Sequence, residues 1–288
     1  MDGTELRNLW ERAFGDTEKY MDYYFSHKAC VSERYTDSEN GELVSMAFFT
    51  PYPVVFRGKA CKSFYIVGVA TEEKYRHEHR MTRLLERAME TCRKKKIPFV
   101  FLCPETPAVY KSLGFVPIYQ RETTYIDGNY VREQTDKTVT VWDKLSETEQ
   151  MAAVSFANEM LEREAFDLYI ERSVTYYNNV ASELQALDGE LLVVWDACGA
   201  VRAVVNLIYE EERYQITEFI ADSCQIKKTV DALLRYLQTD KLQIDDSYFL
   251  HKFCETGVTK KRQEKPYIMY RMLFGESPVI RCYINDIT

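Results

Sequence analysis

The sequence predicts an α/β fold with mixed sheets, built as two related units in tandem. Its 288 residues suit roughly two domains of about 150 residues each. Hydrophobic residues make up 46% and charged residues 28%, the balance of a globular protein. The predicted order of a helix, antiparallel strands, a helix and a strand occurs twice along the chain, which indicates two copies of one α/β unit.

Charge and cysteine usage exclude several functional classes. The net charge of −8 argues against broad binding of nucleic acid or of an anionic membrane surface. No apolar stretch approaches the roughly eighteen residues that a membrane span requires, and the first residues are too polar for a signal peptide. The eight cysteines have no metal-ligand spacing and mostly stand in apolar runs. We therefore expect a cytoplasmic protein with reduced, mostly buried thiols and no metal.

The first half begins with helices and continues with strands. Leu6, Leu9, Trp10 and Phe14 follow helical spacing within a predicted helical region at 4–28. The polar turn SENGE at 38–42 then leads into strands that reach Thr71, with a hairpin turn at Arg57-Gly58-Lys59. The stretch SFYIVGVA within them is almost wholly apolar, as expected for a strand that is covered on both faces.

A clear amphipathic helix follows this strand. One apolar stripe recurs at helical spacing through Met81, Leu84, Leu85, Ala88, Met89 and Cys92. Four cationic residues at 93–96 suit the negative end of its dipole. A buried strand, PFVFLC, comes next, and then a short helix, TPAVYKSL, that Gly114 ends. Residues 115–126 are predicted to form the final strand pair of this unit.

The second half repeats this outline after a polar segment near 128–140. We predict helices at 146–164 and 170–181, strands around 190–221, a further helix from Thr229, and strand-like segments at 246–253 and 267–273. The predicted division is a first domain at 1–130, a second at 131–275 and a tail at 276–288.

The stretch VATEEKYRHEHRMTRLLERA at 69–88 joins a strand to the amphipathic helix. Unpaired backbone N–H groups and the dipole at a helix N-terminus bind phosphate, and Arg76, Arg80 and Arg83 add positive charge there. Taken alone, such arginines are more often a solvated helix face.

The downstream run YKSLGF at 110–115, taken with VATEEKYR, resembles the GNAT acetyltransferase superfamily. In that family the strand end and the following loop hold acetyl-CoA, and a tyrosine protonates the departing CoA thiolate. The resemblance places Tyr110 at the acid position and Arg76 at the leading basic position of the loop. It implies that the acetyl-CoA site consists of Val69, Ala70, Thr71, Arg76, His77, Glu78, His79, Arg80, Met81 and Thr82.

The loop departs from the family pattern at its glycines. His79 and Met81 occupy the two positions where the family has glycine, and Glu78 adds a negative charge. A side chain at such a position keeps phosphate away from the backbone. His79 therefore either replaces the role of the glycine, with imidazole or Arg80 as a donor to phosphate, or blocks the site.

The tandem arrangement resembles the Eis-like branch of this superfamily. The second half lacks the arginine and the glycines of the loop, so it is expected to fold as a degenerate GNAT-like domain that does not bind CoA. From the length of the C-terminal segment, we expect no counterpart of the third, sterol-carrier-like domain that full Eis-like chains carry. In that branch the C-terminal carboxylate acts as the general base, which here implies Thr288. The alternative is that the tail is a surface segment with a free end.

These observations predict an acetyl-CoA-dependent N-acetyltransferase that acts on a primary amine of a small or peptidic cationic acceptor. The acidic net charge would steer such an acceptor toward the protein. No nucleic-acid or membrane partner is expected, and no feature indicates an oligomer. One alternative is a degenerate GNAT protein that acts as an acyl-CoA-binding or regulatory module. A lower-ranked alternative is an aminoacyl-tRNA-dependent peptide transferase, which the acidic charge and the lack of heptads disfavour.

Overall fold

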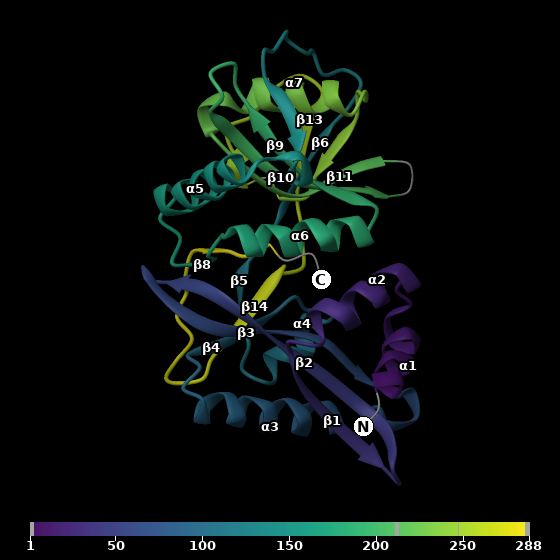
Figure 1. Cartoon of the computed structure of the whole chain (residues 1–288). Coiled ribbons are helices and arrows are strands. Elements are labelled where there is room, and N and C mark those ends of the chain that lie inside the picture. The colour runs from purple at the N-terminus through teal and green to yellow at the C-terminus, as the bar shows by residue number, and fades with distance from the viewer. Residues whose placement is uncertain (1–2, 211–212, 247, 286–288) are drawn as a thin grey trace.

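The computed structural model describes residues 3–210, 213–246 and 248–285. Two β-sheets lie one above the other along the long axis of the molecule, each with its own helices (Figure 1). The first sheet has the strand order β15-β8-β2-β3-β4-β14-β5, with β1 paired to β2, and the second has the order β13-β6-β12-β11-β10-β9-β7. This arrangement confirms the predicted α/β class with mixed sheets.

The first elements follow the predicted order. The helical region divides into α1 (Gly3–Phe14) and α2 (Glu18–Tyr23), which a π-helical turn at Tyr24–Lys28 extends. Thr17 caps α2, since its hydroxyl accepts a hydrogen bond from the Tyr20 N–H. The strands that follow are β1 (Glu33–Glu39), β2 (Glu42–Phe56) and β3 (Lys59–Thr71).

Helices cover both faces of the first sheet. Ala47 and Phe49 of β2 pack with α3 (Arg80–Lys94), whereas Met46 and Phe48 pack with α1 and α2. This alternation follows from the two-residue period of a strand. The predicted stripe of α3 is confirmed, since Leu84, Leu85, Ala88, Met89 and Cys92 are buried. The rest of this region forms β4 (Phe99–Leu102), α4 (Pro107–Lys111), β5 (Val116–Tyr119) and β6 (Glu122–Ile126).

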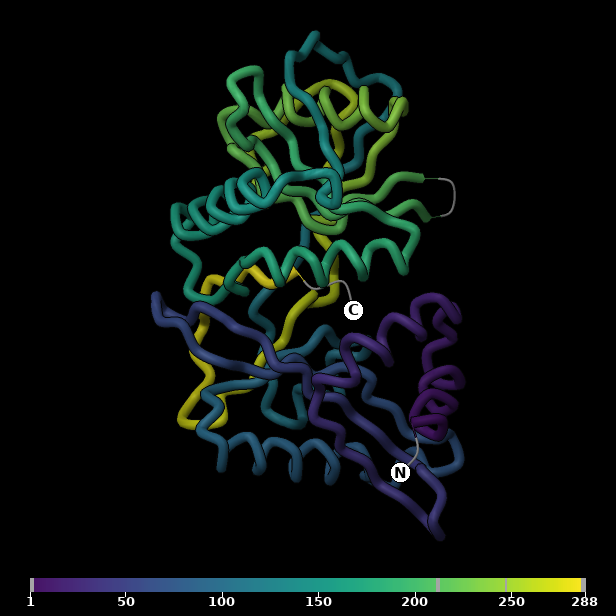
Figure 2. Tube along the Cα trace, in the orientation of Figure 1, coloured from purple at the N-terminus to yellow at the C-terminus, as the bar shows by residue number. Residues whose placement is uncertain are grey.

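The second half has three α-helices, α5, α6 and α7, in its described residues. The predicted helix at 146–164 is α5 (Glu147–Arg163), and a capping box between Ser146 and Glu149 starts it. The next helix, α6 (Val174–Ala186), begins later than predicted because residues 168–170 form a strand and Ser173 is the N-cap. It lies between the two sheets and beside α2 (Figures 1 and 2). The predicted strand-like segment at 246–253 is instead a 3₁₀ turn at Tyr248–Leu250.

The remaining elements complete both sheets. They are β7 (Thr138–Val141), β8 (Leu168–Ile170), β9 (Gly189–Trp195), β10 (Val201–Glu210), β11 (Arg213–Ala221), α7 (Ile226–Tyr236), β12 (Leu242–Ile244), β13 (Val258–Arg262), β14 (Ile268–Met272) and β15 (Cys282–Tyr283). Short 3₁₀ turns occur at Glu73–Tyr75, Trp142–Lys144 and Ser223–Gln225.

The two halves exchange strands β6 and β14, and β8 and β15 of the second half also join the first sheet. The first contains the order β3-β4-β14-β5 and the second the matching order β11-β12-β6-β13. Strand β6, from the first half of the chain, thus lies between β12 and β13, and β14, from the second half, lies between β4 and β5. The expected strand pair at 115–126 is therefore wrong, because β5 and β6 join different sheets. The last segment, yellow in Figure 2, runs from the second half into the first.

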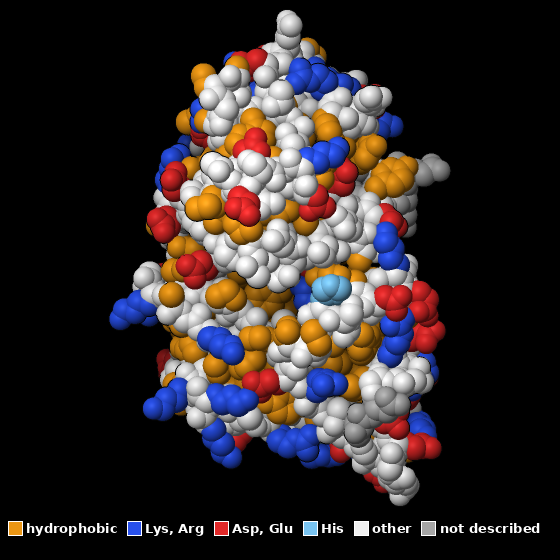
Figure 3. All heavy atoms as spheres, viewed as in Figure 1, with side chains coloured by type: hydrophobic (Ala, Val, Ile, Leu, Met, Phe, Trp, Pro, Cys, Tyr) orange, Lys and Arg blue, Asp and Glu red, His pale blue; other side chains and the backbone are white. Residues whose placement is uncertain are grey.

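Each sheet contains strands from both sides of the predicted domain limit at 130. The predicted limits at 130 and 275 stay a prediction. Hydrophobic side chains collect along the seam between the two halves (Figure 3).

All eight cysteines are free thiols, but only Cys92 and Cys282 are buried, so the expectation of mostly buried cysteines is wrong. Within the described part of the chain, no helix is long and apolar enough to cross a membrane.

Candidate active site

The edge of β3 is open toward β4 over its second half. These parallel strands pair only at Phe64–Val100 and Tyr65–Phe101 and then diverge. A β-bulge follows on β3, where two residues, Gly68 and Val69, stand opposite the single residue Ala47 of β2. Backbone groups from residue 66 onward are thereby available to a ligand between the two strands.

Glycine is the residue type that fits at position 68 of this bulge without displacing its neighbours. Its φ of +60° lies in the left-handed region, and a Cβ there would overlap with the indole ring of Trp10. The sequence contained a signal for this feature, because an isolated glycine within a strand pattern marks a bulge or a close approach. The bulge itself was not predicted.

A pocket of about 430 Å³ opens at this divergence. One wall consists of β3, a second comes from the end of α1 and the loop to α2, and a third from the segment after β4 and from α4. Its lining residues are Trp10, Phe14, Asp16, Tyr20, Tyr65, Ile66, Val67, Gly68, Val69, Cys103, Pro104, Glu105, Tyr110 and Leu187. Two of the residues expected at the active site, Val69 and Tyr110, thus share one pocket. The contributions of α1, α2 and Leu187 were not predicted, because they depend on contacts between distant segments.

Tyr110 projects into this pocket from α4. Among the described residues its hydroxyl has no hydrogen-bond partner, whereas its ring packs edge-on against Phe115. Burial, together with the nearby Cys103 thiol, raises the pKa of Tyr110 to about 12. The hydroxyl therefore stays protonated at neutral pH and can donate a proton.

The loop between β3 and α3 adopts strained backbone conformations. His79, the N-cap of α3, has a φ of +57°, and His77 has a φ of +68°. A side chain in this region costs roughly 1–2 kcal/mol, and glycine avoids that cost. The first of the two positions where the family has glycine therefore keeps a glycine-like backbone while carrying an imidazole. Met81, at the second, lies within the helix and is half-buried against the core.

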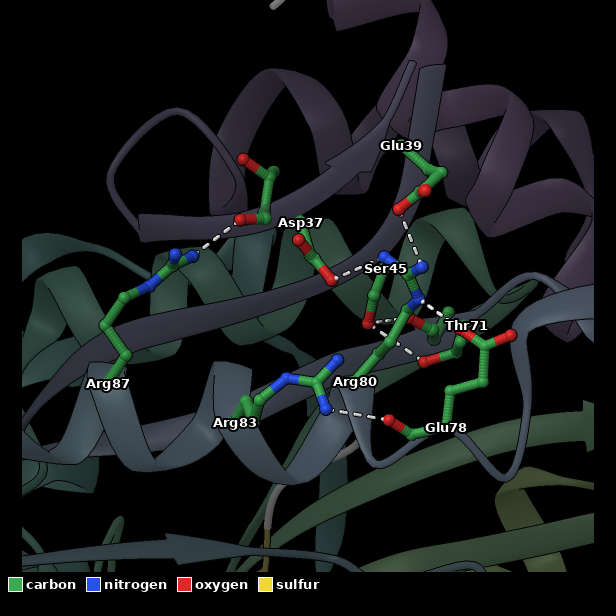
Figure 4. Close-up of polar contacts among 10 residues, drawn as sticks. Asp37, Glu39, Ser45, Thr71, Glu78, Arg80, Arg83 and Arg87 are labelled. Carbon is green, nitrogen blue, oxygen red and sulfur yellow. Dashed lines mark hydrogen bonds and ion pairs between the residues drawn. The ribbon is translucent and has the colours of Figure 1, made fainter. Parts of the chain in front are cut away.

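Arg80 forms ion pairs with three carboxylates (Figure 4). Its guanidinium is therefore not a free cation at the N-terminus of α3. Its guanidinium lies 3.2 Å from an oxygen of Asp37, 2.7 Å from Glu39 and 2.9 Å from Glu78. It also stacks on Tyr75, at 4.8 Å from the ring centroid. These contacts hold the start of α3 against β1 and direct the negative charge of Glu78 toward Arg80. The suggestion that Arg80 donates to phosphate is not supported by this geometry.

Arg76 and Arg83 are the exposed cations beside the N-terminus of α3. Arg83 donates from Nη1 to the carbonyl of Glu78 at 2.8 Å, and Arg76 donates from Nε to the carbonyl of Thr71 at 3.3 Å. Neither forms an ion pair with a described carboxylate. The remaining residues of the predicted loop serve the strand end and the helix. The Ala70 carbonyl and the Thr71 hydroxyl bond to Ser45, and Thr82 is half-buried in the first turn of α3.

The chain approaches its C-terminus between the two halves. Strand β15 pairs with β8, and the buried Asn285 donates from Nδ2 to the Thr217 carbonyl at 2.6 Å and to Asp246 at 3.0 Å. Thr288, the expected general base, lies outside the described residues.

Comparisons with known proteins agree with this architecture. A family model for the acetyltransferase (GNAT) domain matches residues 2–118. A conserved Enterococcus faecalis V583 protein, described as a probable N-acyltransferase, superposes with a TM-score of 0.74 at 16% identity, covering 94% of this chain and 70% of that one. No curated protein matches the sequence significantly.

Two further solved structures share the fold. Eis1 from Mycobacterium abscessus matches with a TM-score of 0.62 at 13% identity, over 94% of this chain and 71% of that one. Saccharomyces cerevisiae N-myristoyltransferase with bound myristoyl-CoA matches with a TM-score of 0.55 at 11% identity, over 91% and 80%. At such identities the structures show the fold, whereas the family model identifies the domain that carries Tyr110 and the 69–82 loop. Residues 2–118 therefore match the acetyltransferase (GNAT) domain, and the chain as a whole has the fold of these solved structures.

Proposed function

We propose that this protein transfers the acetyl group of acetyl-CoA to a primary amine of a small or peptidic cationic acceptor. The observation that carries this proposal is the position of Tyr110, whose protonated hydroxyl shares one pocket with the open edge of β3. An acyl transfer of this kind needs donors for a developing oxyanion and a proton for the departing sulfur. This pocket offers both.

In the proposed reaction the amine nitrogen attacks the thioester carbonyl carbon. The C–N bond forms while backbone N–H groups at the bulge, around Gly68 and Val69, stabilise the negative charge on the carbonyl oxygen. The C–S bond then breaks, and Tyr110 donates its proton to the CoA sulfur. A base takes the proton released by the amine, and we propose the Thr288 carboxylate for this role.

The phosphates of the donor would bind at the N-terminus of α3. This helix of 15 residues has no side-chain cap at His79, so the backbone N–H groups of its first turn remain available to an anion. Arg76 and Arg83 add positive charge without neutralising partners among the described residues. Arg80 acts indirectly in this proposal, because its ion pairs position the start of the helix.

Two carboxylates favour a cationic acceptor. Asp16 lines the pocket and accepts a hydrogen bond from the Trp10 indole N–H at 2.7 Å, which fixes its direction. Glu105 lies on the opposite wall, where it pairs with Lys265 at 3.1 Å. The rings of Trp10, Tyr20 and Tyr65 add faces that attract cations.

A second candidate is an acyl-CoA-binding module without turnover. The observation in its favour is that His79 carries a side chain at a position with a glycine-like backbone, while Arg80 is neutralised by carboxylates. Both features reduce what the loop offers to phosphate. Binding without turnover would be the signature of such a module.

Titration calorimetry with acetyl-CoA, combined with a turnover assay, separates these candidates. Turnover should be followed by loss of thioester absorbance, because the four exposed cysteines would react with thiol reagents. Suitable acceptors are spermidine, an aminoglycoside and a lysine-containing peptide, with a neutral primary amine as control. We expect turnover of a cationic acceptor that weakens as ionic strength rises. Binding without turnover supports the module, and the absence of binding contradicts both candidates.

A further inference from the structure

The second half contains a counterpart of the active-site pocket. Strands β11 and β12 pair only at Gln215–Gln243 and Ile216–Ile244 before they diverge, as β3 and β4 do. Glu164 follows α5 at this place as Asp16 follows α1, and Asp246 follows β12 as Cys103 follows β4. A cavity of about 600 Å³ opens there, and it shares no lining residue with the pocket of Tyr110.

Arginines take the place of the aromatic residues in this second cavity. Its lining consists of Tyr119, Gln120, Arg121, Glu122, Glu164, Asp246, Tyr248, His251, Arg262 and Arg281. Arg262 donates to the Gln120 side-chain oxygen, and Arg281 donates from Nη2 to the Tyr248 hydroxyl at 2.7 Å. Neither arginine forms an ion pair within 4.0 Å with a carboxylate in the described parts of the chain.

Arg121 is the unusual residue of this cavity. Its side chain is buried, with 8% of the residue exposed, and its guanidinium carbon lies 3.3 Å from the centroid of the Tyr267 ring. Its single hydrogen bond within the described residues runs from Nη2 to the Thr217 carbonyl at 3.2 Å, and Nε is buried without a partner. No described carboxylate lies within ion-pair distance. A buried charge without a counter-ion is unfavourable, so buried arginines are normally paired.

Two of the carboxylates that line the cavity, Asp246 and Glu164, accept hydrogen bonds from other donors. Asp246 accepts from the Tyr119 hydroxyl at 2.7 Å and from Asn285 at 3.0 Å, and burial raises its pKa. One oxygen of Glu164 accepts from the Tyr248 hydroxyl at 3.0 Å. Burial disfavours the ionised Arg121, whereas the charges of Asp246 and Asp245 favour it and raise its pKa, but neither carboxylate forms an ion pair with it within 4.0 Å. An anion in direct contact with Arg121 would therefore come from outside the described chain.

We propose that this cavity binds a small molecule through an oxyanion group, a carboxylate or a phosphate, that pairs with Arg121. The free edge of a guanidinium presents parallel N–H donors that match two oxygens of such a group. Arg281 and Arg262 stand at the same cavity and would neutralise a second negative charge. This site is separate from the acyl-transfer pocket, and it does not depend on the proposed function.

The binding site also adjoins the end of the chain. Arg281 directly precedes β15, and Asn285 follows that strand. A ligand held by Arg281 would therefore fix the segment that leads to the C-terminus.

Binding is tested by thermal unfolding and calorimetry with inorganic phosphate and succinate as separate probes. The two probes distinguish the phosphate from the carboxylate. We expect one of them to raise Tm by about 2 °C at roughly ten times its Kd. Arg121→Met should remove this shift, and the ligand-free variant should unfold no earlier than wild type, because an unpaired buried charge is lost. Arg281→Gln, at an exposed position, should weaken binding about tenfold and serves if Arg121→Met does not fold.

Arg76→Gln is the matched control, because it removes an arginine at the cofactor loop of the first half. It should leave unchanged the part of the Tm shift that Arg121→Met removes, whether or not phosphate also binds at the N-terminus of α3. The proposal is overturned if neither probe binds, if the Arg121 and Arg281 variants both respond like wild type, or if Arg76→Gln alone removes the response. The last result would assign phosphate binding to the N-terminus of α3.

Discussion

The indole ring of Trp10 on α1 occupies the space into which any side chain at Gly68 of β3 would project. This contact links the N-terminal helix to the β-bulge that opens the active-site strand. Trp10 also packs against Tyr24 and Phe48 and donates to Asp16, so the ring cannot move away without disturbing its neighbours.

Gly68→Ala should therefore lower both stability and turnover. The new Cβ overlaps with Trp10, and a φ of +60° is unfavourable for alanine, which together cost about 2 kcal/mol or more. Chemical denaturation measures the stability and steady-state kinetics measure kcat. Gly199→Ala is the control for the backbone effect alone, because Gly199 has a φ of +78° but nothing within 4 Å of its Cβ position. Equal losses in both variants would contradict the steric role of Trp10.

Tyr110→Phe should lower kcat by about 100-fold with little change in acetyl-CoA affinity, because it removes the proposed acid but keeps the ring. The pKa of about 12 also predicts the pH profile. A group with a raised pKa stays protonated until the pH approaches that value. Turnover should therefore rise with pH as the acceptor amine loses its proton, and no decline from Tyr110 should appear below about pH 11.

The control for this variant is Tyr125→Phe, which removes a hydroxyl from an exposed position on β6. Unchanged turnover in Tyr110→Phe would show that another group protonates the sulfur.

His79→Gly should tighten acetyl-CoA binding, since the backbone at residue 79 already has a conformation that glycine prefers. The relief of strain is worth about 1 kcal/mol at most, because glycine also adds freedom to the unfolded chain. His77→Gly is a closely matched comparison, with a φ of +68° at a position outside the glycine pattern. Calorimetry should show a gain in affinity for the first variant alone. A loss of affinity in His79→Gly would mean that the imidazole itself contributes to binding.

Arg80→Gln and Arg83→Gln should have different effects, the first on stability and the second on binding of the donor. The first removes the partner of Asp37, Glu39 and Glu78 and leaves three carboxylates close together, so Tm should fall. The second removes an exposed cation with no ion pair among the described residues, so donor affinity should fall while Tm changes little. Differential scanning fluorimetry and calorimetry distinguish the two effects. If Arg83→Gln bound acetyl-CoA like wild type, the charge of Arg83 would have no role in binding the donor.

Extending the chain by two residues beyond Thr288 should lower kcat by about 100-fold if the terminal carboxylate is the base. An extension moves the carboxylate without removing any native residue. It is a cleaner test than deleting the last four residues, because that deletion also removes the buried Asn285. Asn285→Ala reports the structural contribution of this segment through Tm. Full activity in the extended chain would exclude the carboxylate as the base.

The sequence was sufficient for features that depend on local pattern. The stripe of α3 and the apolar strands β3 and β4 follow from periodicity, and the short helix with Tyr110 follows from Pro107 and Gly114. The ion pairs of Arg80 could not be predicted, because its partners Asp37 and Glu39 lie about forty residues earlier in the chain. The bulge at Gly68 had a local signal, whereas the close contact with Trp10 had none.

Strand partners were the least predictable part of the fold. Strand β6 has the same apolar and β-branched character whether it pairs with β5 or with β12. Periodicity determines which face of a strand is buried but not which neighbour it pairs with. The cavity of Arg121 depends on this choice, because Arg121 directly precedes β6 and reaches Thr217 on β11.

Because β6 and β14 each lie in the sheet of the other half, each half of the chain needs a strand from the other to complete its sheet. A fragment that ends near residue 130 would lack β14, which leaves facing edges of β4 and β5 unpaired and open to association with other chains. After cleavage in the segment between the halves, β6 of the first piece would still pair within the second sheet and β14 of the second piece within the first. Such a nicked protein should stay assembled and separate only on unfolding.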